Sequence, residues 1–149
     1  MADVVDGNKE YIVGTSGNYI TKRKKNVLDC VSPALVSNAI VLTEDMTGAV
    51  VFLPASSADT DVITLPAAPA DGTNFKFIFD ADQAQTYVMA GKFEGQIQDG
   101  AGIQDVASAT SVSFLKTTVK KGDRITCIYK GDTWYLDGQF ITAAAMSAA

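Results

Sequence analysis

The stretch Arg124-Ile125-Thr126-Cys127-Ile128-Tyr129-Lys130-Gly131-Asp132-Thr133-Trp134-Tyr135-Leu136 decides the fold of this chain. The apolar residues at positions 125, 127 and 129 recur with a period of two, which is the period of a β-strand. A second strand candidate, Thr133-Trp134-Tyr135-Leu136, follows. The intervening Lys-Gly-Asp contains two residue types that accept the positive φ of a tight turn. We therefore predict two strands joined by a hairpin.

The same period of two recurs through the rest of the sequence. Phe75, Phe77 and Phe79 alternate along one segment, and residues 49–53 form an apolar run suited to a strand buried on both sides. No segment has a convincing amphipathic helical pattern, and the nearest are residues 101–109 and 32–38. Further strand candidates are residues 11–13, 39–42, 61–65, 86–90, 111–115 and 133–136.

Turn-forming pairs separate these runs at short spacing, among them Asp71-Gly72 and Asp99-Gly100. Many short strands with such turns indicate a sandwich or a barrel. We predict an all-β, single-domain, jelly-roll-like fold that is either a β-sandwich or barrel-like. Residues 26–141 form the β domain, residues 1–25 an extended N-terminal arm, and the unpatterned residues 142–149 a flexible C-terminal tail.

The charge of the chain is distributed unevenly. The 149 residues carry a formal net charge of −5. Residues 1–25 hold five basic and three acidic residues, a net of +2, whereas the remainder holds seven basic and fourteen acidic residues, a net of −7. Because phosphate contacts need clustered lysine and arginine, nucleic acid is not an expected partner of this acidic body.

The sequence has no histidine, which removes the commonest general base and metal ligand. A Ser-His-Asp or Cys-His site cannot be built from this chain alone. We predict that it is not an enzyme and has no catalytic residue, cofactor or metal, although Glu94 with a neighbouring carboxylate leaves an acid–base pair as a minor alternative. Two Asp-x-Asp pairs resemble the oxygen ligands that calcium prefers, but neither continues into a calcium-binding loop. We therefore interpret these residues as turn residues: Asp59, Asp61, Asp80 and Asp82.

Cys30 and Cys127 lie in apolar, β-like contexts far apart in the sequence. We predict two buried free thiols in a protein made in a reducing cytoplasm; a disulfide is the alternative if their strands lie side by side. The first residues lack the pattern of a signal peptide, and no apolar run reaches the roughly 20 residues of a membrane helix. A membrane is therefore not an expected partner.

Two groups of residues are candidates for binding a protein partner. The first is the arm, which we predict to dock on an acidic neighbouring surface through Tyr11, Tyr19, Lys22, Arg23, Lys24 and Lys25. For the four basic residues, the alternatives are a solvated loop and, as a minor one, docking on nucleic acid. The second is Trp134 with Tyr135, a candidate subunit face, although Trp134 is alternatively a core residue or a platform for a sugar ring.

The layout between residues 42 and 138 resembles a known class of protein. Leu42-Thr43 and Gly48 precede an apolar strand, and Asp71-Gly72 precedes Phe75 and Phe77. The remaining motifs are Ile63-Thr64-Leu65-Pro66, Gly122-Asp123-Arg124-Ile125 and Gly131-Asp132-Thr133-Trp134-Tyr135-Leu136-Asp137-Gly138. The layout covers about two thirds of the chain. It resembles small β-rich virion proteins of tailed phages, which include capsid decoration (cement) proteins and modules of tail fibres.

The resemblance implies a non-enzymatic virion structural protein. For a decoration protein, it implies a domain that is made in the host bacterial cytoplasm, forms a homotrimer on the lattice of the major capsid protein and stabilises the phage head. Residues 1–25 would supply the arm that contacts the lattice. A tail, fibre or head–tail module is the alternative within the same class, and a carbohydrate-binding β module is an alternative outside it.

Overall fold

The computed structural model describes residues 3–6, 9–13, 19–23, 30–31, 38–56 and 60–149. These residues form β-strands and connecting loops, with one short 3-10 turn at Glu44–Met46, so the all-β prediction is confirmed. A small antiparallel sheet contains β1 (Asp3–Asp6), β2 (Lys9–Val13) and β3 (Tyr19–Arg23). In the described part of the chain, no helix is long and apolar enough to cross a membrane.

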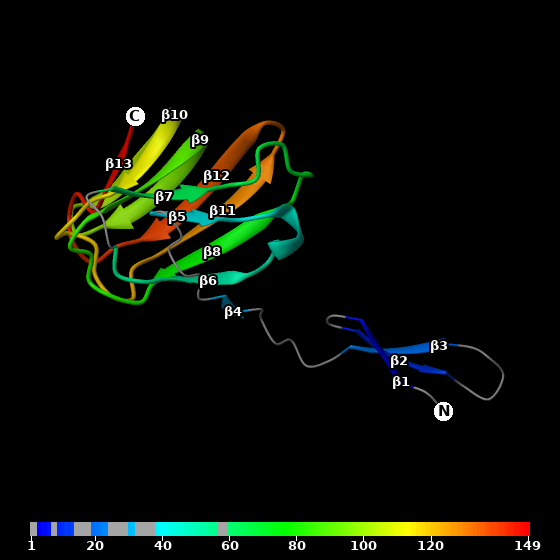
Figure 1. The fold of residues 1–149 in the computed structure, drawn as a ribbon. Coiled ribbons are helices and arrows are strands. Elements are labelled where there is room, and N and C mark those ends of the chain that lie inside the picture. The colour runs from blue at the N-terminus through cyan, green and yellow to red at the C-terminus, as the bar shows by residue number, and fades with distance from the viewer. Residues whose placement is uncertain (1–2, 7–8, 14–18, 24–29, 32–37, 57–59) are drawn as a thin grey trace.

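The other ten strands form one large mixed sheet (Figure 1). They are β4 (Cys30–Val31), β5 (Ala39–Val41), β6 (Val50–Leu53), β7 (Thr60–Thr64), β8 (Asn74–Phe79), β9 (Thr86–Asp99), β10 (Gly102–Phe114), β11 (Arg124–Lys130), β12 (Thr133–Gln139) and β13 (Met146–Ala148). Eight of them follow the order β13-β10-β9-β12-β11-β8-β6-β4, and β7 branches from β9 with β5 beside it.

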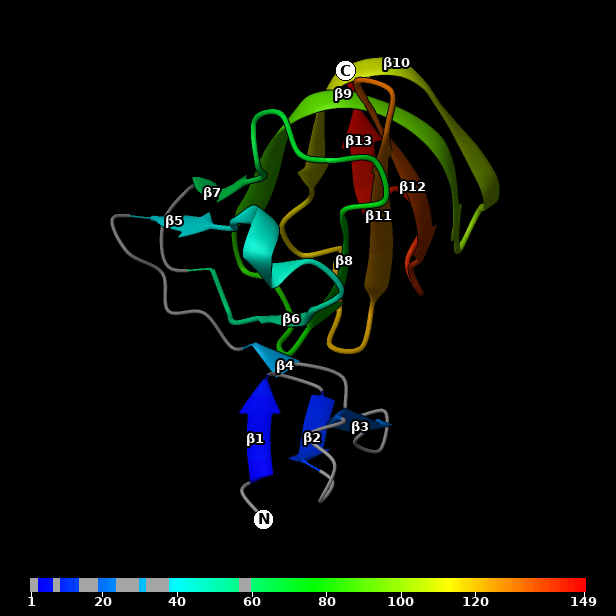
Figure 2. The ribbon, with the colours of Figure 1, turned by 90° about the vertical axis from the view of Figure 1, so that its right-hand side faces the viewer.

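The long strand β9 joins the two halves of this sheet. Its residues 86–89 pair in parallel with β7, and its residues 93–98 pair in parallel with β12. β10 runs antiparallel beside both parts of β9. Because one strand belongs to both halves, the sheet curls around its own core and forms a half-barrel, with β9 and β10 arching over one side (Figure 2).

The core lies inside the curl. Phe75, Phe77 and Phe79 are fully buried, which confirms that alternate residues of this segment share a face. The ring of Phe79 meets the ring of Phe114 edge to face, with 5.3 Å between their centroids. This contact packs β8 against β10 across the curl. Removal of such apolar surface from water stabilises the fold by roughly 25 cal/mol per Å².

The predicted hairpin is present. β11 and β12 pair antiparallel from Arg124 opposite Gln139 to Lys130 opposite Thr133. Gly131 and Asp132 between them have φ of 55° and 77°. A two-residue turn with two positive φ angles matches the right-handed twist of the strands, which is why Gly and Asp occur there.

The β9–β10 hairpin is much longer than the sequence predicted. Residues 102–109 belong to β10, so the helix considered for residues 101–109 is wrong. The register between β9 and β10 shifts between Val106 and Ala109, and Ser108 has φ of 51°. A bulge of this kind inserts residues into one strand and bends it away from its partner.

The C-terminal residues are held in the sheet, so the prediction of a flexible tail at residues 142–149 is wrong. β13 pairs antiparallel with β10, with Met146 opposite Phe114 and Ala148 opposite Val112. Ala145 is fully buried, and its carbonyl accepts the backbone N–H of Leu115 at 2.8 Å. Backbone hydrogen bonds and the packing of Ala145 and Met146 on the core together attach this alanine-rich segment.

The predicted N-terminal arm contains three short strands that form a sheet of their own. In β1–β3, Tyr11 lies opposite both Val4 and Thr21 in the register, and Glu10 lies opposite Lys22. Among the described strands, those of the small sheet pair with one another and not with the large sheet. Figure 1 shows the small sheet beyond β4, at the side of the body away from β9 and β10.

The strand order separates the two cysteines. Cys30 lies in β4 and Cys127 in β11, and β6 and β8 lie between these strands. Three strand spacings place the two backbones roughly 14 Å apart. A disulfide requires Cα atoms within about 7 Å, so the two cysteines do not pair. Cys127 is a buried free thiol, as predicted.

Candidate binding surface

On the outer side of five neighbouring strands, mainly polar side chains lie beside one another in rows that cross the strands. Because side chains alternate along a strand, residues that point away from the core line up across β8, β11, β12, β9 and β10. The printed registers place these residues opposite one another. We call this surface the polar face; its members are Asn74, Lys76, Ile78, Arg124, Thr126, Ile128, Tyr135, Asp137, Gln139, Glu94, Gln96, Gln98, Ile103 and Asp105.

Two amide side chains on the polar face are oriented by their neighbours. Gln96 donates its Nε2–H to Oδ1 of Asp105 across β9 and β10 at 2.9 Å. Arg124 donates from Nη2 to Oε1 of Gln139 across β11 and β12. Each bond fixes the orientation of the amide, which leaves the oxygen and the second N–H of Gln96, and both N–H groups of Gln139, for a ligand.

At one end of the polar face, a hollow of about 550 Å³ lies beside the ring of Tyr135. Tyr135 is 46% exposed and stands opposite Glu94 in the register. The bulge in β10 forms the far wall with Ser108, and Gln96 and Asp105 lie between the wall and the ring. Glycine at position 95 permits this geometry, since a Cβ there would lie 2.1 Å from the carbonyl oxygen of Leu136.

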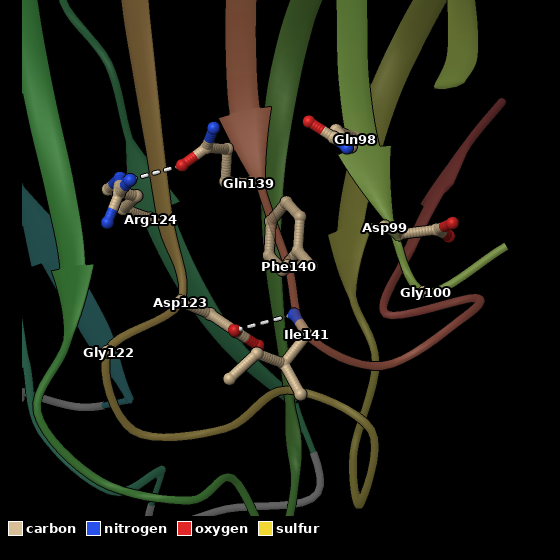
Figure 3. Close-up of a pocket in the computed structure, with 9 residues that line it drawn as sticks. All are labelled: Gln98, Asp99, Gly100, Gly122, Asp123, Arg124, Gln139, Phe140 and Ile141. Atoms are coloured by element: carbon tan, nitrogen blue, oxygen red, sulfur yellow. Dashed lines mark hydrogen bonds between the residues drawn. The ribbon is translucent and has the colours of Figure 1, made fainter. Parts of the chain in front are cut away.

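A second pocket, of about 370 Å³, lies at the opposite end, where β9 and β12 terminate (Figure 3). Its two buried aspartates serve the backbone. Asp123 accepts the N–H of Lys120 at 2.8 Å and that of Ile141 at 3.0 Å. Asp99 accepts the N–H of Ala101 at 2.8 Å, and this bond is the main cause that lowers the pKa of its carboxyl below the ordinary value. Both carboxylates therefore hold loops in place.

The buried titratable groups with shifted pKa values are kept in their unreactive forms. Burial raises the pKa of the Cys127 thiol to about 12, so it stays protonated at neutral pH. Burial, with the nearby charge of Asp61, raises the pKa of Tyr87, whose hydroxyl donates to the carbonyl of Pro54 at 3.0 Å. Neither group is shifted toward the neutral range that acid–base catalysis uses.

The two aromatic residues predicted to share a subunit face point to opposite sides of β12. Trp134 is 4% exposed and packs on Phe75 and Tyr129, with ring centroids 6.1 and 5.1 Å away. Trp134 is therefore a core residue, and its assignment to a subunit face or to a sugar platform is wrong. Tyr135 is on the polar face, where a partner can reach it.

The other predicted binding residues belong to the small sheet. Tyr11 is in β2, and Tyr19, Lys22 and Arg23 are in β3, so the structure gathers them in one sheet but not with Tyr135. Lys24 and Lys25 lie outside the described residues.

Of the four aspartates interpreted as turn residues, Asp80 and Asp82 lie in the turn after β8. Asp80 pairs with Lys121 at 3.5 Å and Asp82 with Lys120 at 3.7 Å, which fixes the turn after β8 against the turn before β11. Asp61 is buried in the strand β7, so its interpretation as a turn residue is wrong, and Asp59 lies outside the described residues. Within the described ranges, no group of three or more acidic or cysteine side chains is arranged to hold a metal ion.

Sequence reasoning missed Glu94, Gln96, Gln98 and Asp105 as parts of one surface. A signal was available, because Phe93 and Ile97 alternate with these polar residues along β9. The glycines at 91 and 95 interrupt the apolar positions, which hid the alternation.

The chain was compared with known families and proteins. No protein-family model matches it, and none of the curated proteins compared matches it significantly.

Proposed function

We propose that this chain is a non-enzymatic virion structural protein, a capsid decoration protein of a tailed phage. It binds copies of itself as a homotrimer, attaches to the lattice of the major capsid protein at the virion surface and stabilises the head. Its function lies in repeated contacts between symmetric copies, each of which is individually weak.

The observation that supports this proposal best is the separate sheet β1–β3. Its strands contain 4, 5 and 5 residues, and among the described strands they pair with one another alone. Sheets this small need a packing partner for stability. A surface of the capsid lattice, or the body of a neighbouring copy, would supply that partner.

Charge favours the same arrangement. Residues 1–25 have a net charge of +2, and the remainder of the chain has a net charge of −7. Lys22 and Arg23 in β3 extend into the basic run of the arm. Opposite charge attracts the arm toward an acidic lattice or toward the acidic body of another copy, and it raises the rate of docking.

The body offers exposed apolar side chains that a contact between copies would bury. Val41 in β5 is 61% exposed, and Val62 in the adjacent β7 is 41% exposed. Apolar side chains of this kind form the centres of subunit interfaces. They lie at the β5 edge, on a different part of the molecule from the polar face.

The test is co-sedimentation of the full chain with purified heads of the phage that encodes it, together with light scattering of the free protein. We expect a trimer that pellets with heads. A variant without residues 1–25 should keep the fluorescence of buried Trp134 but fail to pellet, and Lys22→Glu with Arg23→Glu should weaken pelleting.

Lys92→Glu is the matched control, because Lys92 is an exposed lysine of the body, paired with Asp132. It should pellet as the unmodified chain does. Pelleting with isolated tails and not with heads would replace the decoration role by a tail or fibre role. A monomer that binds neither would overturn the proposal.

A further inference from the structure

We propose that the end of the polar face beside Tyr135 is a binding site for a neutral oligosaccharide. The ring of Tyr135 is the platform for one sugar, and Gln96, Asp105 and Glu94 contact its hydroxyl groups. This inference rests on the surface of the body and does not depend on the role proposed for the chain in a virion.

The ring of Tyr135 is accessible to a ligand, and its backbone is held in the centre of the sheet. It is 46% exposed, while its neighbours in sequence, Trp134 and Leu136, are each 4% exposed and anchored in the core. Its backbone is paired on both sides, opposite Ile128 of β11 and Glu94 of β9. A ring mounted on a central strand loses little freedom on binding, and its apolar face suits the C–H side of a sugar.

The polar groups around the ring match the hydroxyls of a sugar. A sugar hydroxyl both donates and accepts, so a site needs acceptors and donors side by side. The carboxylates of Glu94 and Asp105 accept, and the hydroxyl of Ser108 can do either. The hydrogen bond from Gln96 to Asp105 holds both side chains in position before a ligand arrives.

The shape of the surface fits a short chain of sugars better than one sugar. The hollow of about 550 Å³ is shallow and open to solvent, so a chain of sugars can lie across it and extend beyond its rim. It is bounded by the bulge of β10 on one side and by Tyr135 on the other. The polar face continues from it through Asp137, Gln98 and Gln139, which would meet further sugar units.

The charges at the hollow select against anionic ligands. Glu94 and Asp105 line it, no lysine or arginine is among its lining residues, and the nearby Lys92 is paired with Asp132 at 3.0 Å. A phosphate or a uronic acid would meet repulsion there. For the same reason, the hollow is a poor site for nucleic acid, which requires cationic contacts.

The experiment is a titration of the ¹⁵N-labelled full chain with three neutral sugars, cellohexaose, maltohexaose and hexa-N-acetylchitohexaose, followed by amide chemical shifts. We expect at least one of the three to shift the amides of residues 94–96, 105–108 and 135. Tyr135→Ala should weaken that affinity roughly tenfold or more, and Tyr135→Phe should retain it, because the ring provides the contact. Gln96→Ala should weaken it as well.

Lys116→Ala is the matched control, because Lys116 is exposed in the loop that follows β10, away from the polar face. Its affinity should equal that of the unmodified chain. Absence of shifts with all three sugars would overturn the proposal. So would shifts that map elsewhere on the body, or an affinity that Tyr135→Ala leaves unchanged.

Discussion

The carboxylate of Asp99 at the end of β9 accepts the backbone N–H of Ala144, 45 residues later in the chain, at 2.9 Å. Its other oxygen accepts the N–H of Ala101 at 2.8 Å. One buried side chain therefore shapes the β9–β10 turn and fastens the segment that leads into β13. This relationship explains how a C-terminal stretch without apolar patterning is held against the body.

The first prediction concerns this attachment. Asp99→Ala removes the acceptor for two backbone N–H groups, and we expect β13 to open more often than in the unmodified chain. Hydrogen exchange should become faster at Ala144 and in β13, while exchange in β11 should stay slow. Asp137→Ala, which removes an exposed carboxylate of the polar face, is the control and should leave the exchange of β13 unchanged.

The second prediction is the acid dependence that follows from the same group. The pKa of Asp99 is lowered in the folded state, chiefly by the N–H of Ala101, so the unfolded chain binds its proton first as pH falls. The stability from this carboxylate is complete above the ordinary pKa near 3.9 and is lost as pH falls through the lower folded pKa. Urea midpoints between pH 6 and pH 3 should fall less steeply for Asp99→Asn. Parallel curves would contradict the assignment.

The third prediction uses two glycines that differ in their surroundings. Gly95 and Gly102 have φ of 137° and 125°, so a side chain is strained at either position. A Cβ at Gly95 would also lie 2.1 Å from the carbonyl oxygen of Leu136, whereas a Cβ at Gly102 meets nothing within 4 Å. We expect Gly95→Ala to reduce the free energy of unfolding by about 3 kcal/mol and Gly102→Ala by about 1 kcal/mol. Equal losses would show that β9 and β12 do not approach closely there.

The fourth prediction separates the two neighbouring aromatics of β12. Trp134→Ala leaves a cavity against Phe75 and Tyr129 and should reduce the free energy of unfolding by about 3–5 kcal/mol. Tyr135→Ala removes a half-exposed ring from a central strand and should reduce it by only about 1 kcal/mol. Urea denaturation measures both. Similar losses for the two variants would contradict their opposite orientations.

The sequence predicted the parts of the fold that depend on local patterning. Alternating Phe75, Phe77 and Phe79 and the hairpin turn at Gly131 and Asp132 follow from strand period and turn chemistry, and both are present. The parallel pairing of β9 with β7 and β12 could not be predicted, because it joins segments far apart in sequence.

The residues of the candidate site were predicted only in part, because some of them lie on a segment with low intrinsic strand preference. Tyr135 was predicted, with Trp134, as part of a subunit face, but its neighbours on β9 and β10 were not predicted as part of any surface. Residues 102–109 are rich in alanine, serine, aspartate and glutamine, which have low intrinsic strand preference. They form a strand because pairing with β9 supplies what propensity does not. A surface assembled from such strands is visible only once the register is known.

The last prediction concerns the buried thiol of Cys127. It is fully buried in β11, and burial raises its pKa to about 12, so almost no thiolate forms at pH 8. In a Cys30→Ser background, where Cys127 is the one remaining cysteine, the folded protein should react with a thiol-specific disulfide reagent only as fast as it unfolds. In urea the reaction should be immediate, and the Cys30→Ser, Cys127→Ser double variant, which has no thiol, gives the background signal.

Because β6 and β8 separate β4 from β11, the unmodified chain should also keep two free thiols under mild oxidation. Rapid labelling of the folded variant, or an intramolecular disulfide in the unmodified chain, would contradict the position of β11 inside the curled sheet.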